Sequence, residues 1–259
     1  MIGVPDRVSL KRKLYRAIDG VSPSVAVDVG HVAPIFAGPT VEEWVWVANQ
    51  SLLFLGEESA QATDVDLVVR DAEGTVVHRR TERVLPDSFM RVNVGRYLAD
   101  GGPGDSDGTI SVGTVEITRK SPAGGYRGTT RPQIELVTAN SHCAVHTQGA
   151  VARGRPWSFI AAWHPDDDRL FFVLTNRQSH SVEAEVGIAV PGRAGQPLAT
   201  HTIQIPARGA RVLEIQLDPA SAGQLTNGLV EIRYNMPGIG HADLICASHD
   251  LTRLSIDHE

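Results

Sequence analysis

The densest group of potential metal ligands or proton carriers in the chain is Ser141-His142-Cys143-Ala144-Val145-His146. On a helix, His142 and His146 would share a face within reach of one ion, but the glutamate of the zinc-protease signature is absent. On a strand the two histidines also share a face, but their backbones lie about 13 Å apart, since a strand rises about 3.3 Å per residue. That distance is too large for both to bind one metal ion. A site would therefore use one of them with groups from elsewhere in the chain. Cys143 would point to the opposite face, with Val145, as a small core residue.

Four side chains are candidates for ligand binding, and they are His142, His31, Trp163 and His164. An exposed Trp163 beside His164 could hold a sugar ring or a peptide, because an aromatic face offers a large contact area at little entropic cost. The alternative is a tryptophan half buried against its own sheet. No metal is favoured; the alternative set of ligands is His31, His142 and His249. No acid has a spacing that marks it as the third member of a triad, so catalytic residues stay unassigned.

The polar segment 100–108 contains Gly104-Asp105-Ser106-Asp107-Gly108, which matches the Gly-x-Ser-x-Gly string of serine hydrolases. That string works on a tight turn between a buried strand and a helix, whereas here a strand follows it. Its aspartates are oxygen ligands of the kind Ca²⁺ prefers, but the full acidic pattern of a calcium loop is missing. A solvated acidic turn is expected. The sequence also lacks a phosphate-binding glycine loop, a dinucleotide fingerprint and paired Cys-x-x-Cys ligands, so no cofactor is predicted.

The segments that must position these residues occur as a repeat, once in each half of the chain. Each half has an apolar run that stops at Asn, a Pro followed five residues later by Arg-Val, and a late strand with Val-Glu-Ile. The matching segments are Trp44–Asn49 with Phe171–Asn176, Pro86–Val92 with Pro206–Val212, and Gly113–Ile117 with Gly228–Ile232. Because the matches keep their order, the sequence predicts a tandem duplication.

The repeat also pairs Ser141-His142 with Ser248-His249, each following an apolar strand. This predicts that both halves end in a strand that leads to Ser-His. His142 lies a few residues before the link between the halves, so its side chain is expected to face the cleft between them. His146 is expected to be dispensable.

Strand, turn and strand alternate from Pro23 onward. Residues 64–70 and 75–78 flank the turn Asp71-Ala72-Glu73-Gly74, and Val182–Val190 leads through a Pro- and Gly-rich turn into Leu198–Ile205. Short strands with frequent turns predict an all-β chain of two antiparallel β-sandwiches. The pattern resembles immunoglobulin-like or fibronectin-like sandwiches; the resemblance concerns architecture and implies no activity.

The predicted organisation is an N-terminal helical segment (1–22, with its helix over Val8–Ile18), a first sandwich (23–148) and a second sandwich (149–259). The link between the sandwiches is short, so the two domains are expected to pack together.

The net charge of −6 gives no field that would attract phosphate backbones, so nucleic acid is not an expected partner. No run of about 18 apolar residues and no apolar signal sequence is present, and Cys143 and Cys246 lie in different halves. A cytoplasmic protein without a transmembrane segment is expected. The excess of Arg over Lys, with abundant Ala, Gly and Val, is typical of a GC-rich, bacterial genome.

Duplicated sandwiches without a complete catalytic motif favour a non-enzymatic binding or assembly protein whose partner is a protein or a small polar ligand. One alternative is an enzyme with a His-containing site between the domains, with or without a metal, built from His31, His142 and His146 with Trp163 and His164. Another is a carbohydrate-binding module.

Overall fold

The computed structural model describes residues 29–49, 61–99, 110–120, 132–147, 151–153, 156–193 and 197–258. It is mainly β-structure, so the all-β prediction is confirmed. The predicted N-terminal helix, the 100–108 segment and the predicted domain boundary at 148–149 lie outside the described residues. Over the part of the chain that is described, no helix has the length and apolar character needed to cross a membrane.

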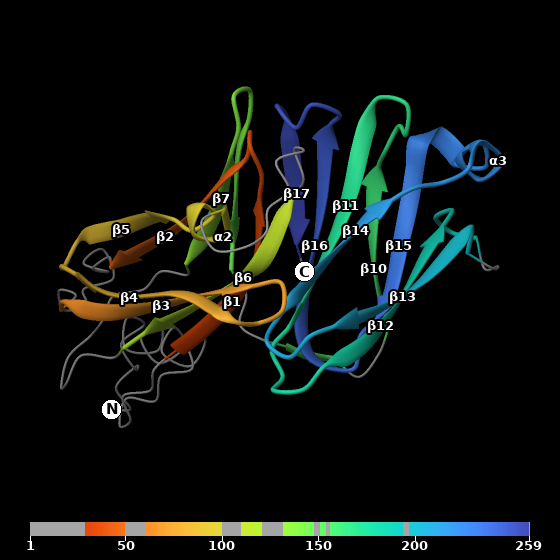
Figure 1. Ribbon diagram of the computed structural model, residues 1–259. Helices are drawn as coiled ribbons and strands as arrows, with labels where there is room; N and C mark the ends of the chain where they lie inside the picture. Colours follow the sequence, from red (N-terminus) through yellow and green to blue (C-terminus); the bar gives the residue numbers. More distant parts are fainter. Residues whose placement is uncertain are drawn as a thin grey trace, which may run out of the picture.

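The first half of the chain forms two four-stranded antiparallel sheets (Figure 1). Sheet I has the strand order β1-β6-β3-β4, and sheet II has the order β5-β2-β7-β8. The elements are β1 (Val29–Ala37), β2 (Glu42–Asn49), β3 (Thr63–Asp71), β4 (Val76–Val84), β5 (Ser88–Asn93), α2 (Arg96–Ala99), β6 (Ser111–Arg119), β7 (Gln133–Val137) and β8 (His142–His146). The inner faces of sheets I and II share one apolar core, which includes Ile35, Val45, Leu67, Ile117 and Ile134.

The second half forms two further antiparallel sheets. Sheet III has the order β10-β15-β12-β13, and sheet IV has the order β14-β11-β16-β17, with β9 paired to β16. The elements are β9 (Val151–Arg153), β10 (Trp157–Ala162), β11 (Asp168–Asn176), β12 (Val182–Ala189), β13 (Ala199–Ile205), β14 (Ala210–Ile215), α3 (Pro219–Ala222), η2 (Thr226–Gly228), β15 (Leu229–Asn235), β16 (Gly238–Ser248) and β17 (Leu254–His258). Their shared core includes Phe159, Leu170, Phe172, Ile188 and Ile232.

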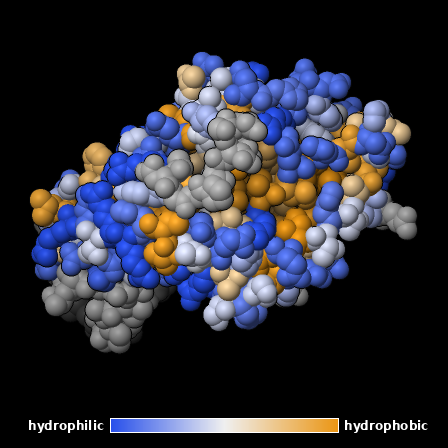
Figure 2. All heavy atoms as spheres, in the orientation of Figure 1, coloured by the Kyte–Doolittle hydropathy of each residue, from blue (hydrophilic) through white to orange (hydrophobic). Residues whose placement is uncertain are grey.

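Both predicted hairpins are present. β3 and β4 pair through the turn at Asp71, where Gly74 has a φ of 82° that residues with a side chain rarely adopt. β12 and β13 pair in the same way in the second sandwich. The apolar core of the second sandwich reaches the surface along its side between β13 and β14, where Figure 2 shows apolar residues gathered; Ile203 and Leu213 are partly buried there.

The two sandwiches have the same strand order. When strands are numbered from β1 in one and from β10 in the other, each sandwich has a sheet 1-6-3-4 and a sheet 5-2-7-8. In an immunoglobulin domain the first two strands share a sheet, whereas β1 and β2 lie in opposite sheets here because the Gly38–Val41 turn carries the chain across. The order therefore departs from the immunoglobulin arrangement. Local sequence marks where strands occur but not which strands pair.

Asn49 and Asn176 occupy corresponding positions, each as the buried last residue of its strand. The Nδ2 of Asn49 donates to the carbonyls of Val84 and Leu85. The Nδ2 of Asn176 donates to those of Ile205 and Pro206 in the same way. These Asn side chains fasten the end of one sheet to the end of the other.

The same contacts correct the expected pairing of Pro86 with Pro206. Pro206 corresponds to Leu85, so the sequence match is one residue out of register. Asp87 and Arg208 confirm the corrected register, since they follow at corresponding positions with φ values of 52° and 58°. A shift of one residue matters in a strand because it moves every side chain to the other face.

The expected correspondence of the two Ser-His pairs is also wrong. His142 is the first residue of β8 and lies opposite Val137, as Leu254 opens β17 and lies opposite Ala247. His249 instead lies in the turn after β16. The two Ser-His dipeptides therefore occupy different places in their sandwiches, because they were aligned by local similarity and not by strand pairing.

The two sandwiches pack directly on each other through an apolar cluster. It joins Phe36, Val41 and Leu136 of the first sandwich to Phe171, Val173, Ile245, Ala247, Leu251 and Leu254 of the second. The rings of Phe36 and Phe171 meet edge to face with their centroids 5.1 Å apart. The outer face of sheet IV is thus covered by the first sandwich.

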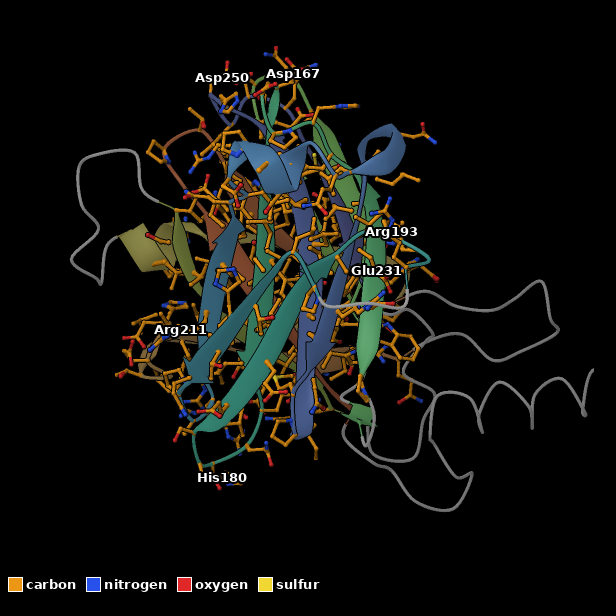
Figure 3. All side chains as sticks on the ribbon, turned by 90° about the vertical axis from the view of Figure 1, so that its right-hand side faces the viewer. Asp167, His180, Arg193, Arg211, Glu231 and Asp250 are labelled. Atoms are coloured by element: carbon orange, nitrogen blue, oxygen red, sulfur yellow. The ribbon has the colours of Figure 1, made fainter. Side chains whose placement is uncertain are left out.

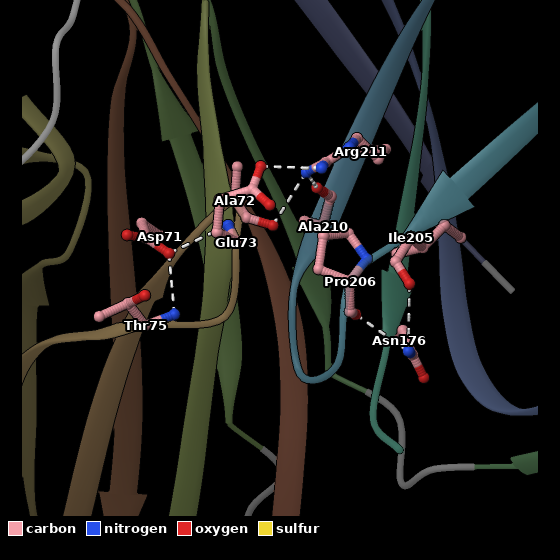
Figure 4. Close-up of polar contacts among 9 residues, drawn as sticks. All are labelled: Asp71, Ala72, Glu73, Thr75, Asn176, Ile205, Pro206, Ala210 and Arg211. Carbon is pink, nitrogen blue, oxygen red and sulfur yellow. Dashed lines mark hydrogen bonds and ion pairs between the residues drawn. The ribbon is translucent and has the colours of Figure 1, made fainter. Parts of the chain in front are cut away.

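A second contact between the sandwiches joins the β3–β4 turn to the β13–β14 turn (Figure 4). The carbonyl of Ala72 accepts hydrogen bonds from Ala210 N (3.1 Å) and Arg211 Nη1 (3.0 Å), and Glu73 forms a 2.8 Å ion pair with Arg211. A Cβ atom on Gly209 would overlap the carbonyl oxygen of Ala72. The close approach of the two turns therefore depends on glycine.

Candidate functional site

The outer face of sheet II gathers aromatic and polar side chains from four strands. Successive residues of β2 point to opposite faces, so Val45 and Val47 enter the core while Trp44 and Trp46 point outward. The pairing places Trp46 between Arg91 of β5 and Gln133 of β7, and Trp44 between Asn93 and Glu135. Residues far apart in the sequence thus form one surface.

One part of this face is an exposed aromatic pair. The rings of Trp46 and Phe89 lie 5.5 Å apart at an angle of 34°. Phe89 is 59% exposed, and Trp46 is half-buried. Aromatic surface of this extent lowers its free energy when a partner removes it from water.

The other part is a fixed polar group. The Arg91 guanidinium lies over the Trp44 ring, 4.1 Å from its centroid, and its Nε donates to Glu135 Oε2 at 2.8 Å. Glu135 Oε2 also lies 3.9 Å from His142 Nε2. A guanidinium stacked on a ring and tied to a carboxylate is held in one orientation before any ligand arrives.

The structure places the predicted residue His142 on this same face, with 59% of its side chain exposed. It faces away from the contact between the sandwiches, so the expected direction is wrong. Cys143, the next residue on β8, points the opposite way and packs against the apolar cluster between the domains. The prediction that His142 and His146 share a face is confirmed, and Cys143 is partly buried on the opposite face.

His31 lies elsewhere, buried in the first sandwich. Its Nδ1 is 3.1 Å from Thr147 Oγ1, and its Nε2 is 3.4 Å from Arg119 Nη2. Thr147 follows β8 at the end opposite His142, about 16 Å away at about 3.3 Å per residue. His249 contacts the carbonyl of Asp166 in the second sandwich. The alternative metal set therefore does not come together, and the described ranges contain no group of three or more potential ligands placed to hold an ion.

Trp163 is buried, with 2% exposure, inside the core of the second sandwich. Its Nε1 donates to the carbonyl of Asp168 at 2.9 Å. Of the two interpretations of Trp163, the exposed, sugar-binding one is therefore wrong, and the side chain is buried more deeply than the half-buried alternative assumed. The reason is the pairing: β10 and β11 belong to different sheets, so the turn after Trp163 crosses the end of the sandwich and is not a hairpin tip.

His164 begins that crossing turn and is exposed, with its ring against Gly228. The turn belongs to an acidic end of the second sandwich. Figure 3 shows Asp167 and Asp250 together at this end, opposite His180. Hydrogen bonds from Ser248 and Thr252 hold the pKa of Asp250 at about 2. None of these groups contacts the outer face of sheet II in the described residues.

The contact between the sandwiches encloses a buried polar group that sequence reasoning missed. Glu43 is 1% exposed, and its Oε2 accepts a 2.6 Å hydrogen bond from the amide of Phe36. Burial raises the pKa of Glu43 well above its usual value, against the effect of the Phe36 hydrogen bond, and the charge of Asp243 raises it further. Asp243 itself is 2.9 Å from His241 Nε2. This group lies inside a packed interface and offers no surface to a substrate.

The outer face of sheet II was also missed as a site. The available signal was the alternation of Trp44 and Trp46 with Val45 and Val47 in one strand. The partners Arg91 and Glu135 could not be found in this way, because strand pairing brings them there.

No protein-family model matches the chain, and no curated protein matches it in sequence.

Proposed function

We propose that this is a non-enzymatic binding or assembly protein and that its ligand contacts the outer face of sheet II. The observation that carries this proposal is a difference between the two sandwiches. Counting back from Asn49 and Asn176, Phe171 and Val173 correspond to Trp44 and Trp46, and both are buried under the first sandwich. The face that carries the two tryptophans has no described domain over it.

We propose that the two sandwiches are copies of one ancestral unit. Three features support that duplication: the shared strand order, the buried Asn at the end of β2 and of β11, and the positive φ of Asp87 and Arg208. The equivalent face of the second sandwich packs against protein, which supports a contact role for the outer face of sheet II. Large aromatic residues and Arg are the residue types enriched at binding hot spots.

The chemistry of the face favours binding over catalysis. Its outward residues are Glu42, Trp44, Trp46, Ala48, Phe89, Arg91, Asn93, Gln133, Glu135, Val137, His142, Ala144 and His146. These described residues include no Ser, Cys, Thr, Tyr or Lys, and the Glu135 carboxylate, which could otherwise act as a nucleophile, is already engaged by Arg91. The enzyme alternative is not supported by the positions of its residues, since His31, Trp163 and His142 lie in three different environments.

The cytoplasm remains the proposed compartment. Both cysteines, Cys143 and Cys246, are free thiols. Burial raises the pKa of each thiol, which disfavours the reactive thiolate.

The proposed function can be tested before the ligand is identified. The purified protein is screened against an oligosaccharide array, a random peptide library and itself, the last by sedimentation. Binding in any one arm should weaken at least tenfold in Trp46→Ala and Arg91→Ala. Trp157→Ala is the matched control, because Trp157 is a partly exposed tryptophan of the second sandwich.

Binding that survives both changes on sheet II, or absence of binding in all three arms, would overturn the proposal. Circular dichroism melts of each variant show whether a loss of binding follows from unfolding.

A further inference from the structure

We infer that the ligand of the sheet II outer face is a neutral oligosaccharide that lies across its strands. This inference rests on the proposed function and adds the chemical class of the ligand. It is carried by three properties of the face: its rings, its charge and its area.

The rings suit a sugar. Trp46 and Phe89 present exposed aromatic surface from neighbouring strands. The C–H bonds on one side of a pyranose ring form a flat apolar patch, while its hydroxyls project around the edge. Aromatic surface bordered by polar side chains is complementary to that shape, because it buries the apolar patch and leaves the hydroxyls to hydrogen-bond.

The polar groups beside the rings are suited to hydroxyls. Arg91 uses its Nε for Glu135, and within the described residues no other hydrogen-bond partner occupies its terminal amino groups. Its stacking on Trp44 fixes the plane of these donors. Glu135 supplies carboxylate oxygen, and His142 supplies a ring nitrogen that can donate or accept. Fixed planar donors and acceptors can engage adjacent hydroxyls in pairs with little loss of entropy.

The charge of the face disfavours a strongly anionic ligand. Arg91, its one described cation apart from histidine, already pairs with Glu135. Glu42 accepts a 3.0 Å hydrogen bond from Trp44 Nε1. Apart from the histidines, the outward residues carry one positive and two negative charges, which offers little to a phosphate backbone or an acidic peptide.

The size of the face favours a small ligand over a protein partner. Four strands about 4.8 Å apart, with about five residues each at about 3.3 Å, give a face of about 300 Å². A stable protein–protein interface uses about 20 to 30 residues on each partner. The thirteen outward residues of this face alone are too few for one. A short chain of sugar rings fits its width.

The experiment measures binding of the full chain to purified oligosaccharides by isothermal titration calorimetry. The neutral probes are hexasaccharides of glucose, xylose, mannose and N-acetylglucosamine, each with its monosaccharide; heparin and polygalacturonate are the charged probes. We expect at least one neutral hexasaccharide to bind at least tenfold more tightly than its monosaccharide, and neither charged polymer to bind at the same face. Trp46→Ala and Arg91→Ala should each weaken that binding at least tenfold, with Trp157→Ala unchanged.

The results with different probes distinguish two claims: that the outer face of sheet II binds a ligand, and that this ligand is a neutral sugar. Binding only of a peptide or of a second copy, sensitive to Trp46→Ala, would refute the sugar and leave the binding face in place. Binding only of a charged polymer at this face would also refute the sugar. Sugar binding that is insensitive to Trp46→Ala and Arg91→Ala would refute both claims. Arg91→Lys separates charge from geometry, because it keeps the cation but loses the planar donors, and it should not restore affinity.

Discussion

Replacing the buried strand-end asparagines one at a time tests whether the two sandwiches are fastened in the same way. Asn176 donates through Nδ2 to the carbonyls of His180 (2.7 Å) and Pro206 (2.9 Å) and accepts from Gln178 N at 2.9 Å. Three good hydrogen bonds at about 1 kcal/mol each predict that Asn176→Ala lowers the free energy of unfolding by about 3 kcal/mol.

Asn49 uses its Nδ2 donors in the same way, but its Oδ1 acceptor differs from that of Asn176. Its Nδ2 donates to the carbonyls of Gln61, Val84 and Leu85, while its buried Oδ1 has no hydrogen-bond partner among the described residues. Asn49→Ala is therefore expected to cost about 2 kcal/mol, about 1 kcal/mol less than Asn176→Ala, because only the two N–H groups lose partners.

The assay is urea unfolding followed by tryptophan fluorescence, with linear extrapolation to water. Asn235→Ala is the control, since Asn235 also ends a strand but is exposed; it should change stability by less than about 0.5 kcal/mol. If both buried variants stay within about 0.5 kcal/mol of the wild type, or if Asn49→Ala costs more than Asn176→Ala, the hydrogen-bond reasoning fails.

Four further predictions concern pH, packing and metal content. Because the pKa of Glu43 is raised in the folded protein, the wild type loses stability as pH rises from the usual glutamate range through the raised pKa. Glu43→Gln should therefore be more stable than the wild type in urea at pH 8 and should lose that advantage toward pH 4. Superimposable profiles of stability against pH for the two proteins would contradict this. The hydrogen bonds and charge of Arg169 lower the pKa of Glu214, so stability present above the usual glutamate pKa should fall as pH drops through the lowered value, and Glu214→Gln should flatten that acid limb. Phe171→Ala should cost about 3 to 5 kcal/mol by emptying the contact between the sandwiches, whereas Phe89→Ala on the exposed face should cost less than about 0.5 kcal/mol; equal calorimetric shifts would refute this assignment. Elemental analysis of the purified chain should find no stoichiometric zinc, iron or copper, and finding one would favour the enzyme alternative.

Much of the fold could be read from local patterns. The hairpins at Asp71 and at Val182–Ile205 were predictable because alternation with period two and the residues of tight turns are properties of neighbouring residues. The side of β8 that carries Cys143 was predictable for the same reason. The register of the repeat was not, because local similarity allowed slips of one residue or more, as at Pro206.

The candidate site shows more clearly what local sequence patterns cannot predict. His142 was identified as a candidate, but its direction was assigned wrongly because alternation defines two faces without saying which one is covered. Trp163 was expected at a hairpin tip, either exposed or half buried against its own sheet, and its full burial follows from the separation of β10 and β11 into different sheets. In both cases the missing information was the identity of the packing partner.

The sequence by itself determined the strands, their two-faced character and the separation of Trp44 and Trp46 from Val45 and Val47, because each of these depends on adjacent residues. Only the tertiary structure decided that the valines face the core, that Arg91 and Glu135 join the tryptophans, and that Glu43 is buried between the sandwiches. The physical reason is that burial and pairing are energies shared between segments far apart in the chain. Such energies depend on strand order, which no single segment encodes.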